Sequence, residues 1–535
     1  MIELDPIRDR LEGVIREQMD ATRVPGMAWA LTDREHTLWV AAQGYADLAA
    51  KVPLAADMLF AIGSIGKSFT SIALLQEHEA GNLDLDQPVT RYLPWFEVRS
   101  PYHPITIHHL LSHSSGLIST YDFATSDWPH VFALRDTEVA GPPGQRFSYC
   151  NDGYKTLGLV LRAITGRRYG DVIRSRILEP LGMYATDPVI TNETRKRLAV
   201  GHEPFYDDRP ARRSDPLVRA NWFETDTADG CLASCVGDLA IYVRMLLNRG
   251  RGPLGPILCV QSFARMSSRV IEAGPGEWYG YGLETFEHDG HTIIGHGGGM
   301  PGFMSAMTAD MDAGVGAVVL ANAASDPGPI ANYARQLLRA ARTGASMPDA
   351  QVTHCDPTIV EDASEYEGTY LNENTSFKLV AKDKRLMMDW KAERLILERR
   401  GKDAFLVPHG DFAFFLLGFD RQAGCVVAAT FGSDHYVNER YGGSLSNCAA
   451  PTAWSAYVGH YRSFSPWLSN FRVIARRGSL FFVFPTGTEV RLIRAGDAHF
   501  KFDGWEDGIR FASIVDGHAI EATLVTSKYY RVDTP

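Results

Sequence analysis

The sequence predicts an α/β region followed by two small all-β domains. Over residues 1–345, strand-like apolar runs alternate with long helical patterns. Near residue 345 the composition shifts to short β-type runs separated by Gly, Asp and Asn. The later part also repeats itself, which indicates two copies of one domain. We therefore expect a domain at 1–345, a linker at 346–360, and β-domains at 361–448 and 449–535.

The composition is that of an ordinary globular protein and excludes several classes. Hydrophobic residues make up 45% and charged residues 22% of the 535 positions, which excludes disorder, collagen and coiled coil as the main state. Lys and Arg number 53 against 64 Asp and Glu, so we expect no nucleic-acid partner. No run of 18 apolar residues predicts a membrane span, so we expect no membrane partner. The seven scattered cysteines form no CxxC pair, and a cytoplasmic location is the expectation.

The first element expected along the chain is a surface helix. Ile7, Leu11, Ile15 and Met19 recur at helical spacing. Charged residues interrupt the apolar ones, so the segment lacks the apolar core of a signal peptide.

Ser64 and Lys67 form the most informative pair. A strand-like run from Met58 meets Gly63 and then a helical run, which places Ser64 at a helix entrance. Positions i and i+3 share a helix face, so Lys67 can bring its amine beside the Ser64 hydroxyl. The partial positive charge of the helix N-terminus would favour an oxyanion formed there. By itself, however, this spacing more often marks an N-cap serine and a solvated lysine.

A loop from Pro142 carries Tyr149 and Asn151 and opens a long helix. The two side chains can project toward one cavity. The phenol could act as a proton carrier, and we expect the Lys67 ammonium to lower its pKa from about 10. The alternative is an N-cap asparagine beside a packed aromatic ring.

Three glycines follow His296. Without side chains, Gly297, Gly298 and Gly299 let a strand lie flush with a substrate and leave backbone N–H groups free. This pattern predicts an edge strand that lines a cleft. Otherwise the histidine is a turn residue, and it lacks partner ligands at metal-binding spacing. We expect no metal and no cofactor.

The tail begins after a stretch at 343–357 that is poor in large apolar residues, as a linker should be. The pentapeptide Tyr366–Tyr370 then recurs as Tyr457–Tyr461, and Phe377–Lys382 aligns with Phe471–Arg476. Period-2 passages suit antiparallel strands, which predicts two small barrels or sandwiches.

The order Ser64-x-x-Lys67, Tyr149-x-Asn151 and His296-x-Gly298 resembles the serine β-lactamase and penicillin-binding protein superfamily. The resemblance covers about residues 5–340. It includes stretches similar to those of class C-like members at 83–96, 105–117, 177–188 and 229–250. It implies an antiparallel sheet flanked by helices, plus an all-helical region, with a cleft between them.

The resemblance also implies a role for each site residue. Ser64 would be the acylated nucleophile, with Lys67 and Tyr149 as the proton-transfer pair. Asn151 would bind Lys67 and the substrate. The N–H groups of Ser64 and Gly299 would form the oxyanion hole, and His296 and Gly298 would line the substrate. Tyr149 would activate the deacylating water.

Two features of the resemblance bear on the substrate class: the chain differs from many family members at His296, and it is similar to one branch of the superfamily. His296 stands where many members place a lysine whose ammonium pairs a substrate carboxylate. The motifs and the two appended β-domains resemble the D-aminopeptidase branch, which implies lipocalin-like barrels and a serine hydrolase acting on amide or peptide bonds. The alternatives are a carboxylesterase, a β-lactamase or DD-carboxypeptidase, and a non-hydrolytic sensor or binding protein. We expect a small molecule or short peptide as substrate. The sequence leaves open whether the chain forms a homo-oligomer.

Overall fold

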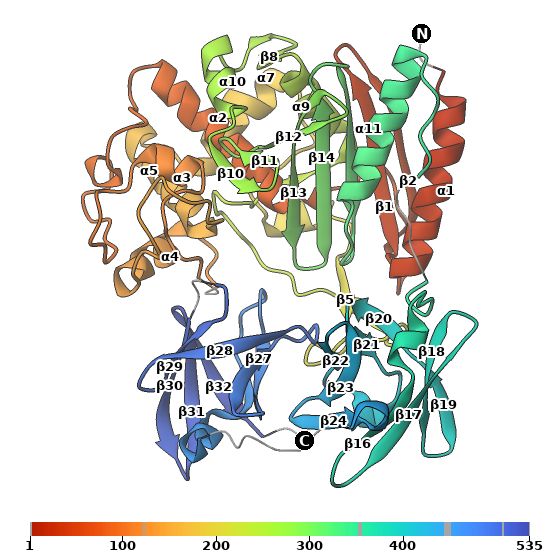
Figure 1. Cartoon of the computed structure of the whole chain (residues 1–535). Helices are drawn as coiled ribbons and strands as arrows, with labels where there is room; N and C mark the ends of the chain where they lie inside the picture. Colours follow the sequence, from red (N-terminus) through yellow and green to blue (C-terminus); the bar gives the residue numbers. More distant parts are fainter. Residues whose placement is uncertain (1–2, 121–122, 351–355, 443–450, 506–507, 534–535) are drawn as a thin grey trace. The chain divides into compact units, whose positions relative to one another are not determined.

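The computed structural model describes residues 3–120, 123–350, 356–442, 451–505 and 508–533 (Figure 1). The chain divides into two compact units, Met1–Glu203 with Leu217–Thr353, and Pro204–Pro216 with His354–Pro535. The expected linker contains 351–355, and the expected boundary at 448 falls in 443–450. Both of these stretches lie outside the described residues. Among the described helices, none is long and apolar enough to cross a membrane.

The first unit is built on a nine-stranded antiparallel sheet. Each neighbouring pair of strands runs in opposite directions. In spatial order the strands are β10 (Ile271–Gly274), β11 (Glu277–Tyr279), β12 (Glu284–His288), β13 (His291–Met300), β14 (Phe303–Asp310), β15 (Val315–Ala321), β1 (Gly26–Asp33), β2 (Thr37–Asp47) and β3 (Val52–Pro53).

The two faces of this sheet pack against different helices. Alternate residues of a strand point to opposite faces. Met27, Trp29 and Leu31 pack with α1 (Asp5–Thr22) and α11 (Gly328–Thr343), as Figure 1 shows for these elements. Ala28 and Ala30 belong to the larger core shared with α9 (Val236–Leu247) and the helical region. The predicted N-terminal helix is confirmed, because the apolar side chains that predicted it are all buried in α1.

The helical region covers the second face and holds the long buried helices of the site. Its helices are α2 (Gly66–Glu79), α3 (Ile107–Leu111), α4 (Asp127–Ala133), α5 (Asn151–Thr165), α6 (Tyr169–Ile173), α7 (Glu179–Leu181), α8 (Asn192–Arg195) and α10 (Val260–Met266). Short two-stranded sheets join β4 (Phe60–Ala61) to β7 (Ala233–Ser234), β5 (His202–Pro204) to β6 (Leu217–Arg219), and β8 (Arg251–Gly252) to β9 (Gly255–Pro256). The expected combination of an antiparallel sheet, flanking helices and a helical region is confirmed.

The second unit contains two antiparallel β-structures. The first has the spatial order β19 (Glu393–Ile396), β18 (Arg385–Trp390), β17 (Ser376–Lys382), β16 (Gly368–Leu371), β24 (Asp434–Asn438), β23 (Cys425–Phe431), β22 (Leu417–Gln422), β21 (Ala404–Leu406) and β20 (Glu398–Gly401). Its two end strands follow each other directly in the chain, so the sheet curls into a nearly closed barrel. The second is a closed barrel of β25 (Gly459–Arg462), β26 (Asn470–Arg476), β27 (Ser479–Val483), β28 (Glu489–Gly496), β29 (His499–Phe502), β30 (Gly508–Val515), β31 (His518–Leu524) and β32 (Ser527–Val532).

The predicted duplication is visible in matching contacts. Tyr370 donates its hydroxyl to the Tyr366 carbonyl oxygen at 2.9 Å, and Tyr461 does the same to Tyr457 at 2.9 Å. Each tyrosine also stacks on the aligned phenylalanine of the next strand, with ring centroids 5.3 Å and 5.4 Å apart. The repeated pentapeptide therefore closes the same corner of both β-structures.

A segment from the middle of the chain belongs to the second unit, which the sequence analysis did not foresee. Pro204–Pro216 leaves the first unit after β5 and returns at β6. Arg400 and Arg462 donate to its Ala211 carbonyl oxygen and its Asp207 carboxylate, one from each β-structure. The segment also donates from Arg212 to the His409 carbonyl oxygen at 2.6 Å. It therefore links the two β-structures of this unit.

Replacing Asn322 by Ala should lower the free energy of unfolding by about 2–3 kcal/mol, because buried unpaired polar groups are costly. The Asn322 side chain is fully buried. It accepts from the Gly26 N–H at 2.8 Å and donates to the Tyr45 and Val200 carbonyl oxygens at 2.9 and 3.1 Å. Urea unfolding measures the change. The exposed Asn192→Ala variant is the control, and an equal effect in both variants would contradict this account.

Candidate active site

Ser64, Lys67 and Asn151 meet at the start of α2. Ser64 lies in the 3-10 turn η1 (Gly63–Ile65), which leads directly into that helix. The fully buried Lys67 amine donates to the Ser64 hydroxyl oxygen at 2.9 Å and to the Asn151 amide oxygen at 2.8 Å. Its third acceptor is the main-chain carbonyl oxygen of Asp229, at 2.8 Å. The i,i+3 spacing thus brings an amine into hydrogen-bond contact with a hydroxyl.

Burial sets the protonation of this amine. Loss of hydration lowers the pKa of Lys67 to about 8, because water no longer stabilises the charged form. The Asp229 carboxylate opposes this shift, whereas the Lys155 ammonium adds to it. Lys155 is itself buried and pairs with Asp152 at 3.0 Å. A neutral Lys67 amine is therefore accessible near pH 8, and a neutral amine can accept a proton from Ser64.

Tyr149 lies beside Ser64 and Lys67. Its phenol lies near the Ser64 side chain, and the Lys67 amine lies 4.9 Å from the centre of its ring. Burial of the phenol raises the pKa of Tyr149 above its ordinary value. The sequence-based expectation that Lys67 lowers this pKa is therefore wrong, because desolvation of the phenolate dominates. The residue keeps 37% of its surface exposed, so it also borders the open side of the site.

His113 fixes the loop that carries Tyr149, and the sequence analysis assigned it no role. Its carbonyl oxygen accepts from the Ser148 N–H at 2.7 Å, and its Nδ1 accepts from the Cys150 N–H at 3.0 Å. The imidazole also packs on the Tyr149 ring, with centroids 4.1 Å apart. The available signal was the Ser-His-Ser-Ser-Gly turn at 112–116, directly after the apolar positions of α3.

His296 is buried beside the site, and both ring nitrogens are engaged. Its Nε2 lies 2.9 Å from the Tyr279 hydroxyl, and its Nδ1 contacts the Gly297 carbonyl oxygen. Burial lowers the pKa of His296 to about 4, so the ring is neutral at ordinary pH. The ring therefore supports Tyr279 and supplies no positive charge. The substrate contact expected of His296 stays a prediction.

The glycines of β13 lie against the turn that holds Ser64. Pairing with β12 stops at Gly295, and in the described part of the chain residues 296–300 pair on one side only, with β14. A Cβ on Gly63 would lie 2.7 Å from the Gly299 backbone nitrogen. A Cβ on Gly298 would lie 2.0 Å from the Ile62 carbonyl oxygen. The one-sided pairing and these close approaches place an unpaired stretch of β13 beside the turn that holds Ser64.

One group of described residues has the composition of a metal site. Ligand atoms of His291, Asp310 and Asp312 lie within 4.8 Å of one another. The Asp310 carboxylate, however, also lies 3.5 Å from Arg335 and 3.7 Å from Arg339. Two guanidinium groups already supply the positive charge that a cation would bring. We interpret the group as an ion-pair network.

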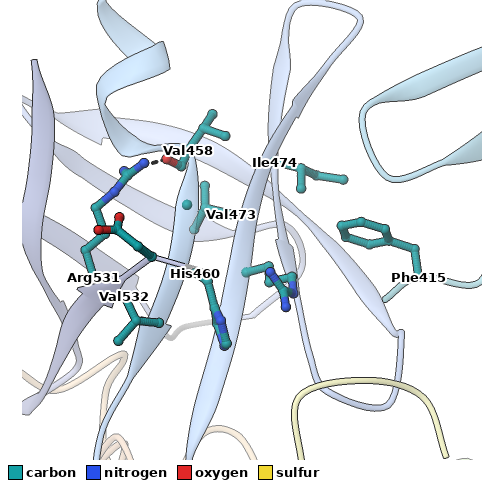
Figure 2. A pocket seen from close by; sticks show the side chains of 10 residues that line it. Phe415, Val458, His460, Val473, Ile474, Arg531 and Val532 are labelled. Carbon is teal, nitrogen blue, oxygen red and sulfur yellow. Dashed lines mark hydrogen bonds between the residues drawn. The ribbon is translucent and has the colours of Figure 1, made fainter. Parts of the chain in front are cut away.

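The second unit has a pocket of its own, of about 440 Å³. Figure 2 shows that it is bordered by β25, β26 and β32 of the closed barrel and by Phe415 of the other β-structure. Val458, Val473 and Ile474 give it an apolar wall, while Arg531 is held by a 2.6 Å hydrogen bond to the Val458 carbonyl oxygen. It contains none of the predicted site residues.

Comparisons with known proteins agree with this geometry. A family model described as beta-lactamase matches residues 11–341. Penicillin-binding protein 4 of Amycolatopsis lactamdurans is 28% identical, over 67% of this chain and 97% of that protein. The octameric penicillin-binding protein homologue from Pyrococcus abyssi has a TM-score of 0.59 and 26% identity, over 80% of this chain and 99% of that one. D-amino acid amidase from Ochrobactrum anthropi SV3 has a TM-score of 0.51 and 28% identity, over 59% of this chain and 92% of that one.

Replacing Gly298 by Ala should slow covalent labelling of Ser64 at least tenfold, because the new Cβ would push β13 away from Ile62 and from the neighbouring turn that holds Ser64. Gly297→Ala is a matched control, since its Cβ would meet only the Ser305 carbonyl oxygen, at 3.7 Å. The measurement is intact mass over time with a serine-reactive inhibitor. Equal labelling rates in the two variants would contradict the close packing of β13 on this turn.

Proposed function

Because this chain belongs to the β-lactamase family, whose members are serine hydrolases, we propose that it hydrolyses amide bonds of D-aminoacyl substrates through an acyl-enzyme. One observation carries the proposal: the buried Lys67 amine lies 2.9 Å from the Ser64 hydroxyl, with a pKa lowered to about 8. An amine of that kind can take the hydroxyl proton and activate the serine.

Acylation begins when the Ser64 hydroxyl oxygen attacks the amide carbonyl carbon and its proton passes to the Lys67 amine. The carbonyl π electrons move to oxygen, where the N–H groups of Ser64 and Gly299 would stabilise the negative charge. When the oxyanion collapses, the C–N bond breaks and the leaving nitrogen needs a proton. Tyr149 is a protonated phenol in contact with Ser64, so it can donate this proton and be recharged by the Lys67 ammonium.

Deacylation reverses these roles with water as the nucleophile. A water molecule gives a proton to the Lys67 and Tyr149 pair while its oxygen attacks the ester carbonyl carbon. The Ser64 oxygen then leaves and takes the proton back, which releases the free acid. The assignment to Lys67 and Tyr149 is joint, because the two groups share contact with the same hydroxyl.

Three observations support an amide of a D-amino acid as substrate. His296 is neutral, so it offers no charge for the carboxylate of a β-lactam or of a peptide C-terminus. The similarity to the D-amino acid amidase, at 28% identity, points to an amide instead. A phenol placed to protonate a leaving amine also favours amides over esters, whose leaving group needs less help.

Replacing Ser64 by Ala should lower kcat by about four to six orders of magnitude, because the covalent nucleophile is lost. The assay is a panel of D- and L-aminoacyl amides, p-nitrophenyl esters and a chromogenic cephalosporin. We expect the native chain to cleave the D-amides fastest. Intact mass should show an acyl adduct that the variant lacks. Retained turnover in Ser64→Ala, or a cephalosporin as the best substrate, would overturn the proposal.

The rate kcat/KM for an uncharged ester should rise with pH and level off above about pH 8. Lys67 accepts a proton only when its amine is neutral, and its pKa is about 8, so the active fraction grows as pH rises toward that value. An ester without an amine keeps the substrate from titrating. In Lys67→Arg the group stays protonated, so the remaining rate should be low and should not follow this curve. A rate that falls between pH 6 and 8 would contradict Lys67 as the base.

A further inference from the structure

The carboxylate of Glu284, which can still accept hydrogen bonds, borders the candidate active site. Glu284 is the first residue of β12 and lies directly opposite Tyr279 on β11 and Gly295 on β13. Gly295 precedes His296, so Glu284 stands where β12 ends its pairing and the open edge of β13 begins. A substrate lying along that edge would pass beside this side chain.

The Glu284 carboxylate has no ion pair or hydrogen bond with any described residue, and its side chain is reached by solvent. Protein around it and the neighbouring Glu277 carboxylate raise the pKa of Glu284 to about 7. Its negative charge also raises the pKa values of Tyr149 and Tyr279. Glu284 lies opposite Tyr279, whose hydroxyl lies 2.9 Å from His296 and whose ring centre lies 6.4 Å from that of Tyr149.

In the described part of the chain, no cationic side chain forms an ion pair with the Glu284 carboxylate. The Lys67 amine is already engaged by Ser64, Asn151 and Asp229. His296 is neutral. The surroundings of Glu284 thus favour a cation brought in by the ligand, because a positive group would relieve its repulsion from Glu277. A primary ammonium suits a single carboxylate at an exposed edge.

We propose that Glu284 binds the free α-ammonium group of the aminoacyl substrate and so selects substrates with an unblocked amine. The inference rests on the proposed function and adds the subsite that recognises its substrate. In an aminoacyl amide the ammonium nitrogen sits on the carbon next to the reacting carbonyl. A carboxylate beside the strand edge that flanks Ser64 can hold that nitrogen while the carbonyl faces the nucleophile.

The test compares substrates that differ only in the amine. The probes are D-phenylalanine amide, its N-acetyl derivative and 3-phenylpropanamide, together with the p-nitrophenyl esters of D-phenylalanine and 3-phenylpropanoic acid. Glu284→Gln removes the charge and keeps the shape. It should raise KM for the amine-bearing probes about tenfold to a hundredfold, with kcat changed less than threefold, since hydrogen bonds to charged groups contribute this much. The probes without a free amine should be unaffected.

Glu277→Gln is the matched control, because it removes the neighbouring carboxylate on β11. It should leave KM for the amine-bearing probes within about twofold. Glu284→Asp keeps the charge and should recover part of the affinity. An unchanged KM in Glu284→Gln, or an equal loss for all probes, would overturn the inference.

The two esters distinguish a failure of the Glu284 subsite from a failure of the proposed amidase function. If the native chain cleaves no amide but prefers the amine-bearing ester, and Glu284→Gln abolishes that preference, the ammonium subsite stands and the amidase proposal falls. If the native chain cleaves the amides but Glu284→Gln leaves the preference for an amine intact, the amidase proposal stands and the ammonium subsite falls. A native chain that shows no preference for an amine in either series overturns the subsite.

Discussion

The candidate active site depends on one amine, that of Lys67, which is buried at the start of α2. The three acceptors around Lys67 are a hydroxyl, a side-chain amide and a main-chain carbonyl, none of which carries a charge. They hold the amine in place without adding a negative charge, and loss of hydration is the main cause of its lowered pKa. The backbone at the start of α2 is closely packed: a Cβ on Gly282 would lie 2.9 Å from the Lys67 carbonyl carbon, and one on Gly66 would lie 3.2 Å from Gly230.

The part of the site that local geometry determines could be predicted from the sequence. The contact of Ser64 with Lys67 follows from one helical turn, and the corner at Tyr370 follows from a repeated pentapeptide. The properties that depend on packing could not. The direction of the Tyr149 pKa shift depends on how much protein surrounds the phenol, and the anchoring by His113 depends on a turn meeting a distant loop. No local pattern marks Pro204–Pro216 as part of the second unit.

The two copies in the second unit share a corner and differ in closure. In both copies, a tyrosine hydroxyl bonds the carbonyl oxygen four residues earlier and its ring stacks on the next strand. The second copy closes by pairing β25 with β32. In the first copy the two end strands are β19, which pairs with β18, and β20, which pairs with β21. In the described residues β19 and β20 do not pair with each other, and only Leu397 connects them along the chain. The same tyrosine corner therefore occurs both in a closed barrel and in a sheet whose end strands do not pair. Closure is one of several means of protecting the edges of a sheet.

The segment Pro204–Pro216 imposes an order on biosynthesis. A ribosome releases these residues long before Arg400, Arg462 or Asn470, whose side chains later bind them. Until then the segment stays a loop without its partners, and its capture requires contacts between residues far apart in the chain, which form slowly. The second unit therefore cannot be moved to another protein as one continuous stretch, because Pro204–Pro216 belongs to it but lies within the sequence of the first unit.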